Sequence, residues 1–256
     1  MLASLKTSIA QTVSRISPRL WAEFDIMRRN KYFEPEFWLL PELCKGVEVA
    51  VDVGGNQGLF SYYMSKSASA VHVFEPNPIC LAQMKRLGRR NIVVHPVALS
   101  SQIGELTLRF DPQNTGIGTI EAANRLDQNA GIKTITERQV QVCRLDDFGL
   151  SGVGFVKIDV EGHEAAVVEG GLRTIAATRP ILLIESEVRH NPTAFSSLEA
   201  LLEPLEYTAW YRSDGRFLQA KSGDLPRLQR DGSVYINNFL FVPRQRMATF
   251  EALGAR

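Results

Sequence analysis

The residues with the clearest chemistry form a short run that combines an acid with several glycines. From Val49 to Gly58 the sequence reads V-A-V-D-V-G-G-N-Q-G, an apolar strand followed by a glycine-rich turn. Such a turn brings bare backbone against a ligand, because a Cβ would occupy the space that the ligand needs. We therefore predict a cofactor-binding turn made by Asp52, Gly54, Gly55, Asn56 and Gly58.

The spacing of these glycines separates two cofactor classes, dinucleotides and S-adenosylmethionine. The dinucleotide pattern G-x-G-x-x-G, placed on Gly54, requires glycines where the chain has Asn56 and Leu59. Placed on Gly55 and Gly58, its first glycine would be Val53. Neither register fits, so S-adenosylmethionine is favoured, and a nicotinamide-dependent oxidoreductase is kept as an alternative.

A second acid follows the next apolar run. Glu75 comes directly after Ala70–Phe74 and lies about 20 residues beyond Gly54, where an acid can accept both hydroxyls of a nucleoside ribose. Prolines at 76 and 78 restrict the backbone and present the carboxylate from a stiff turn. Further predicted cofactor-binding residues are Phe60, Pro76 and Ala98.

The third group of reactive residues follows a buried strand, in the sequence F-V-K-I-D-V-E-G-H-E from Phe155 to Glu164. Charges at the carboxyl end of a central strand face the cleft in which such folds bind ligands. We predict Asp159 as the first candidate for a general base, or as a contact to the cofactor, and His163 as the second candidate base. Glu161 and Glu185 are predicted to face the substrate. These two acids and Asp159 and His163 could instead surround a magnesium ion, which we do not favour.

Together these motifs, with Arg144-Leu145-Asp146-Asp147-Phe148, closely resemble the FkbM-type family of S-adenosylmethionine-dependent methyltransferases. The resemblance covers about residues 47–187. It implies a class I methyltransferase fold, an α/β doubly wound, Rossmann-like, seven-stranded and mostly parallel sheet with an antiparallel C-terminal hairpin. It also implies that Asp52, Gly54 and Gly58 line the methionine part of the cofactor and that Glu75 holds the ribose.

Members of this family mostly methylate hydroxyl oxygens, often on sugars or secondary metabolites. The resemblance therefore implies an O-methyltransferase with a small-molecule or carbohydrate acceptor. A nitrogen or peptide acceptor, or a cofactor-binding protein without catalysis, remains an alternative.

The elements that position these residues alternate between strand-like and helix-like runs from Val47 onward, which is typical of a parallel sheet with crossover helices. Glu164–Ala177 is predicted as one helix, and Asn191-Pro192 as the start of another that ends near Leu202. Further predicted strands are Gly104–Phe110 and the pair Tyr207–Arg212 and Arg216–Gln219, followed by a closing strand at Tyr235–Val242.

Two segments lie outside this alternation. Residues 111–136 are rich in Asn, Gly, Thr and Gln, and we predict a substrate-side loop insertion there. Residues 1–46 are predicted to be an N-terminal helical extension to a catalytic domain at 47–256, since Leu2, Leu5, Ile9, Val13 and Ile16 recur at helical spacing.

Composition narrows the function classes further. The chain has 256 residues, 45% of them hydrophobic, and its 29 basic and 28 acidic residues leave a net charge of +1. The net charge of the chain is therefore too small to attract it to nucleic acid or to an anionic membrane. The three cysteines lie far apart, which fits neither a disulfide framework nor a zinc site, and no run approaches the about 18 apolar residues of a membrane span. We expect a cytoplasmic protein; its oligomeric state is open.

Overall fold

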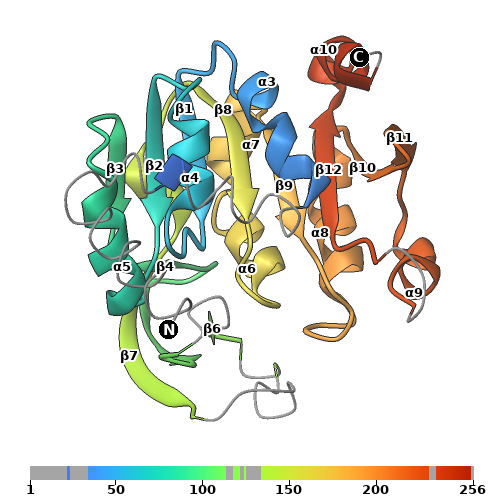
Figure 1. The fold of residues 1–256 in the computed structure, drawn as a ribbon. Coiled ribbons are helices and arrows are strands. Elements are labelled where there is room, and N and C mark those ends of the chain that lie inside the picture. The colour runs from blue at the N-terminus through green and yellow to red at the C-terminus, as the bar shows by residue number, and fades with distance from the viewer. Residues whose placement is uncertain are drawn as a thin grey trace, which may run out of the picture.

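The central element of the fold is an eight-stranded mixed sheet, which crosses Figure 1 from β3 to β11. The computed structural model describes residues 22–23, 34–113, 118–121, 124, 134–230 and 235–254. In spatial order the strands are β3 (Ile92–His95), β2 (Ala70–Phe74), β1 (Val49–Val53), β8 (Val153–Ile158), β9 (Ile181–Glu185), β12 (Asn238–Pro243), β10 (Tyr207–Ser213) and β11 (Arg216–Gln219).

The strand directions confirm a mostly parallel sheet with an antiparallel C-terminal hairpin. The first five strands in this order are parallel, whereas β12 runs antiparallel to both β9 and β10. The predicted count of seven strands is one too few, because β11 pairs with β10 and adds an edge strand.

Helices cover both faces of the sheet, as a doubly wound fold requires. They are α3 (Leu40–Leu43), α4 (Leu59–Met64), α5 (Pro78–Met84), α6 (Glu164–Glu169), α7 (Leu172–Thr178), α8 (Ala194–Leu202), α9 (Leu225–Leu228) and α10 (Met247–Gly254). Short 3₁₀ helices are η2 (Pro35–Leu39), η3 (Lys85–Leu87), η5 (Leu145–Phe148), η6 (Glu203–Leu205), η7 (Ser222–Asp224) and η8 (Arg244–Arg246).

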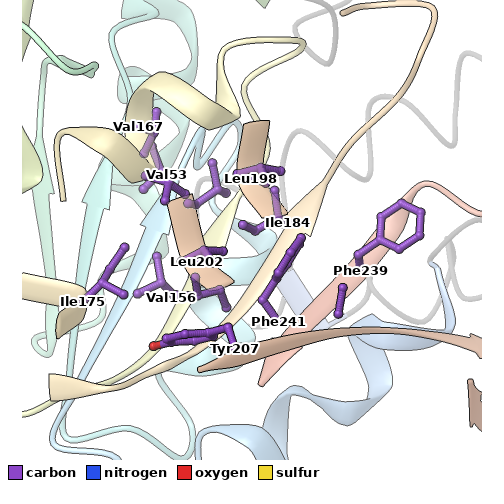
Figure 2. Packing of buried hydrophobic residues seen from close by; sticks show 14 of the residues in the cluster. Val53, Val156, Val167, Ile175, Ile184, Leu198, Leu202, Tyr207, Phe239 and Phe241 are labelled. Carbon is purple, nitrogen blue, oxygen red and sulfur yellow. The ribbon is translucent and has the colours of Figure 1, made fainter. Parts of the chain in front are cut away.

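Successive side chains along each strand point to opposite faces of the sheet and so contribute to two core layers, one on each face. Val51 and Val53 of β1 belong to the layer beneath α6, α7 and α8, while Ala50 belongs to the layer beneath α3 and α4. Figure 2 shows the first layer, in which Leu198 and Leu202 of α8 lie close to Ile184 of β9. Both faces of the strands are therefore buried, which holds their carboxyl ends in fixed positions.

Two helix boundaries differ from prediction. The helix predicted from Glu164 to Ala177 is interrupted at Gly170 and Gly171. Residue 170 must be glycine because a Cβ there would lie 2.0 Å from the Ser100 carbonyl oxygen, and glycine is a poor helix former. The next helix, α7, is stabilised in its first turn by the Asp146 carboxylate, which accepts a hydrogen bond from the backbone N–H of Thr174 at 2.8 Å. Helix α8 begins at Ala194, three residues after the predicted cap, although Asn191 Oδ1 accepts from the Thr193 N–H at 3.1 Å as a capping side chain does.

A second, four-stranded sheet lies beyond the carboxyl ends of β1 and β2 (Figure 1). Its strands are β4 (Ala98–Leu99), β7 (Thr136–Cys143), β5 (Gly104–Phe110) and β6 (Gly118–Thr119). The strand predicted at Gly104–Phe110 is confirmed, whereas β7 was not predicted because its first half is polar. Its small core includes Leu108 and Val140.

The N-terminal helical extension stays a prediction. The leucine and isoleucine positions between 2 and 16 lie outside the described residues. In η2, Phe37 is fully buried and stacks on Tyr63 of α4 with ring centroids 4.7 Å apart. No helix in the described ranges combines the length and apolar character needed to cross a membrane.

Candidate functional site

A pocket of about 650 Å³ opens where the carboxyl ends of β1, β2 and β8 meet the small sheet. Its wall consists of Val53, Gly54, Asn56, Phe74, Glu75, Pro76, Asn77, Ala98, Leu99, Leu108, Gly118, Thr119, Ile120, Asp159, Val160 and Glu161.

The glycines after β1 are required by contacts within the protein. Gly54 has φ +79°, and a Cβ there would lie 1.9 Å from the backbone oxygen of Asp159. A Cβ on Gly55 would lie 2.2 Å from Val73 Cγ1, and one on Gly58 would lie 2.7 Å from Leu87 Cδ1. The turn is thus glycine-rich because β1 and β8 approach closely and α5 packs behind it. Protein atoms, and not a ligand as predicted, therefore fill the space beside these three glycines.

Glu75 is held rigidly in the pocket wall. Its Oε2 accepts from the Asn56 N–H at 2.8 Å, and its Oε1 accepts from the Asn77 N–H at 2.7 Å. The side chain is buried, and burial raises the pKa of Glu75 to about 7, although these two N–H donors act in the opposite direction. Each oxygen keeps a lone pair for a hydroxyl donor in the pocket.

Asp52 lies beneath the turn and is fully buried, outside the pocket wall. The Ser61 hydroxyl of α4 donates to its Oδ2, while Oδ1 has no hydrogen-bond partner among the described residues. Burial raises the pKa of Asp52. The predicted role at the methionine part of a cofactor stays a prediction, and the unsatisfied Oδ1 is compatible with it.

A partly buried ion pair lies at the end of β8. Lys157 Nζ lies 2.9 Å from Asp159 Oδ2 and 4.6 Å from the centroid of the Phe60 ring. Burial opposes the charged form of Lys157, but the carboxylates of Asp159 and Asp52 outweigh it and raise the pKa of this lysine. Phe60 therefore contacts the ion pair rather than the pocket wall. Asp159 reaches the pocket with its position set by Lys157.

His163 joins the small sheet to the start of α6. Its Nε2 lies 2.9 Å from Ser100 Oγ, and its Nδ1 lies 3.1 Å from Glu121 Oε2. Next to it, the Glu161 carbonyl accepts from Thr119 Oγ1 at 2.9 Å and from Asn124 Nδ2 at 2.7 Å. These bonds anchor the described part of the predicted loop insertion over the pocket.

We expect His163→Ala to loosen this anchor. The hydrogen bond from His163 to Glu121, worth about 1 kcal/mol, would be lost from this segment, so amide hydrogen exchange in residues 118–121 should accelerate roughly fivefold. Mass-spectrometric exchange measures this directly, and β2 provides an internal control that should not change. Unaltered exchange at residues 118–121 would show that His163 does not hold the segment.

The remaining predicted acids are engaged elsewhere. Glu161 lines the pocket, but its Oε2 lies 2.9 Å from His190 Nδ1. Glu185 accepts from Asn237 Nδ2 at 2.8 Å, and burial raises the pKa of Glu185 well above its ordinary value. With His163 bound to Ser100 and Glu121, the four groups considered for magnesium do not converge. Nowhere in the described ranges do three His, Cys, Asp or Glu side chains gather as a metal site.

The structure thus brings part of the predicted site together. Predicted residues in the pocket wall are Gly54, Asn56, Glu75, Pro76, Ala98, Asp159 and Glu161. Predicted residues outside that wall are Asp52, Gly55, Gly58, Phe60, His163 and Glu185. Sequence reasoning missed Thr119, Ser100 and Glu121. No local pattern marks them, since Thr119 and Glu121 lie in a segment with weak periodicity and Ser100 directly follows the two-residue strand β4.

The chain resembles known methyltransferases in sequence. Residues 52–209 match the family model of the methyltransferase FkbM domain. Methyltransferase 1 of Beauveria bassiana (strain ARSEF 2860) is 33% identical over 141 residues, which cover 47% of this chain and 57% of that protein. The 31-O-demethyl-FK506 methyltransferase FkbM of Streptomyces tacrolimicus is 29% identical over 153 residues, covering 48% and 59%. The chain spans less than three fifths of the length of these relatives.

The fold is also found in a solved structure. The crystal structure of a methyltransferase FkbM from Methylobacillus flagellatus KT aligns with a TM-score of 0.50 and 18% sequence identity, covering 91% of this chain and 57% of that one. At this identity the likeness shows the fold alone.

Proposed function

Because the chain belongs to the FkbM methyltransferase domain family, we propose that it transfers the methyl group of S-adenosylmethionine to a hydroxyl oxygen of a sugar, glycan or other small metabolite. The relatives' names include one O-directed methyltransferase, which supports the oxygen acceptor. A nitrogen or peptide acceptor is the alternative within the same fold.

The observation that carries the cofactor assignment is the geometry of Glu75. Its two oxygens are oriented by the N–H groups of Asn56 and Asn77, so that both can accept hydroxyl donors from one diol. Gly54 and Asn56 supply backbone to the same wall, and Oδ1 of Asp52 has no partner among the described residues beneath it. These residues fit a nucleoside with an amino-acid tail.

The protein's own contribution to the reaction is positioning and proton removal. S-adenosylmethionine supplies a methyl group on a sulfonium, which is an already activated leaving group. Holding an acceptor oxygen in line can then contribute roughly 7 to 11 kcal/mol. Asp159 reaches the pocket and would accept the hydroxyl proton of the acceptor, while Lys157 fixes its orientation.

Two experiments test this function. Calorimetric titration should detect binding of S-adenosylmethionine and S-adenosylhomocysteine but not of NADH. A screen with labelled methyl donor against nucleotide sugars, glycans and hydroxylated metabolites should then identify an acceptor by mass gain. Absence of binding to both the donor and its demethylated product would rule out the proposal.

Glu75→Gln is expected to weaken S-adenosylhomocysteine binding by about 2 kcal/mol, or roughly thirtyfold. The amide keeps the shape of the carboxylate but loses its charge, and its NH₂ group cannot accept from a backbone N–H or a ribose hydroxyl. Glu48→Gln, at an exposed position before β1, is the matched control and should bind normally. Equal affinity in the two variants would exclude Glu75 as the ribose ligand.

The affinity for S-adenosylhomocysteine should also fall as the pH drops below about 7. Burial raises the pKa of Glu75 to about 7, so the free protein protonates this acceptor below that value. A ligand that prefers the carboxylate then releases a proton on binding, and affinity decreases by at most about tenfold per pH unit. Calorimetry between about pH 5.5 and pH 8.5 tests this, and Glu75→Gln should flatten the slope.

A further inference from the structure

A second cavity, of about 800 Å³, opens at the same edge of the main sheet and shares no wall residue with the first. Its wall combines η2, the end of β10 and the start of β12, and includes Glu34, Glu36, Arg212, Tyr235, Asn237 and Asn238. Most of these side chains are polar or charged. The cavity therefore suits a ligand that makes hydrogen bonds and ion pairs.

Glu36 is the unusual member of this wall. It is 6% exposed, and its carboxylate interacts with its own backbone N–H but has no other hydrogen-bond or ion-pair partner in the described ranges. Burial raises the pKa of Glu36 to about 7. A buried acid without a counter-ion is costly, so this one requires a partner that the described part of the chain does not supply.

The charged residues next to Glu36 do not supply a partner for its carboxylate. Glu34 faces the same cavity and raises the pKa of Glu36 further through repulsion, while Arg212 acts weakly in the opposite direction. The Arg212 Nη1 donates to the Pro35 carbonyl at 3.4 Å instead of to a carboxylate. A cation between Glu34 and Glu36 would relieve both burial and repulsion, whereas a neutral hydroxyl would satisfy one hydrogen bond.

Hydrogen bonds and charge interactions connect residues of the cavity wall with residues near the proposed reaction site. Asn237 lines the cavity and donates to Glu185 Oε1 at 2.8 Å and to Glu187 Oε1 at 3.2 Å. Glu34 is close enough to Lys157 and Asp159 for their charges to act on it. A molecule seated in the cavity would therefore feel the charge of the proposed base, Asp159, which lies in the wall of the first pocket.

We propose that this second cavity binds a basic amine of the acceptor, with Glu36 and Glu34 as the carboxylates that pair with the ammonium group. The inference rests on the proposed function, since it defines the acceptor class of the same enzyme as a hydroxylated amine. Glu36 acts as a specificity residue. It selects the acceptor and takes no part in proton transfer.

The test compares amines with neutral counterparts of similar size on protein saturated with S-adenosylhomocysteine. Ligand-observed NMR would give the affinities of ethanolamine against ethylene glycol and of glucosamine against glucose. We expect each amine to bind at least about tenfold more tightly than its counterpart, and Glu36→Gln to abolish that difference. Equal binding of amines and neutral ligands, or a preference that survives in Glu36→Gln, would overturn the inference.

Controls separate this result from the proposed function and from misfolding. Asp147→Asn, an exposed acid paired with Arg144, should keep the amine preference. Glu36→Gln should bind S-adenosylhomocysteine as the wild type does, and Glu34→Gln is the second variant if Glu36→Gln does not fold. A wild type that binds S-adenosylhomocysteine without amine preference contradicts this inference alone. Failure to bind S-adenosylhomocysteine contradicts the proposed function.

Discussion

Asp159→Asn should reduce methyl-transfer turnover by about 10²- to 10⁴-fold while the affinity for S-adenosylhomocysteine stays within a few fold of wild type. The expected loss is that of a general base, because an amide cannot take the acceptor proton. The carbonyl oxygen of that amide could still accept a hydrogen bond from the Lys157 ammonium, so the buried lysine keeps a partner and the fold should survive. Single-turnover kinetics and calorimetry on the same preparation measure the two quantities.

The control for this variant is Asp147→Asn. Asp147 is also paired with a cation, since its Oδ1 lies 2.8 Å from Arg144 Nη2, but it is exposed and outside the pocket. It should retain full turnover. If Asp159→Asn retained turnover as well, Asp159 would not be the base. If it lost cofactor affinity instead, Asp159 would be a contact to the cofactor amino group.

Gly54→Ala is expected to lower the free energy of unfolding by about 4 kcal/mol. The new methyl group would lie 1.9 Å from the Asp159 carbonyl oxygen, so β1 and β8 must separate, and the φ of +79° adds strain. Because that carbonyl belongs to the backbone at the end of β8, no side-chain rotation can relieve the clash. Urea denaturation measures the loss.

Gly46→Ala isolates the clash from the backbone strain. Gly46 has φ +71°, close to that of Gly54, but a Cβ there would meet nothing within 4 Å. We expect a cost of about 1 to 2 kcal/mol at this position. Equal destabilisation by the two alanines would mean that the close approach of β1 and β8 is not what requires Gly54.

Much of the candidate site could be predicted because of how parallel sheets are built. Gly54, Glu75 and Asp159 each come directly after a sequence pattern that predicts a strand. They must lie at the same edge of the sheet, since the carboxyl ends of neighbouring parallel strands meet there. That inference needs the order of the strands and their direction, but no side-chain contact.

The roles of Asp52 and His163 required the folded molecule. Asp52 is adjacent to the turn in sequence but is buried beneath it, bonded to Ser61. His163 contacts Ser100 across 63 positions and Glu121 across 42. Periodicity describes one segment at a time, so it cannot specify partners that come from a separate sheet.

By itself, then, the sequence determined the family, the parallel sheet and the edge at which its glycines and acids gather, because local patterns and strand direction are sufficient for these. Tertiary structure decided why Gly54 must be glycine, which partners His163 has and that Glu36 is buried without a counter-ion in the described ranges. Each of these depends on distances between segments that are remote in the chain. Such distances are set by the packing of the whole domain.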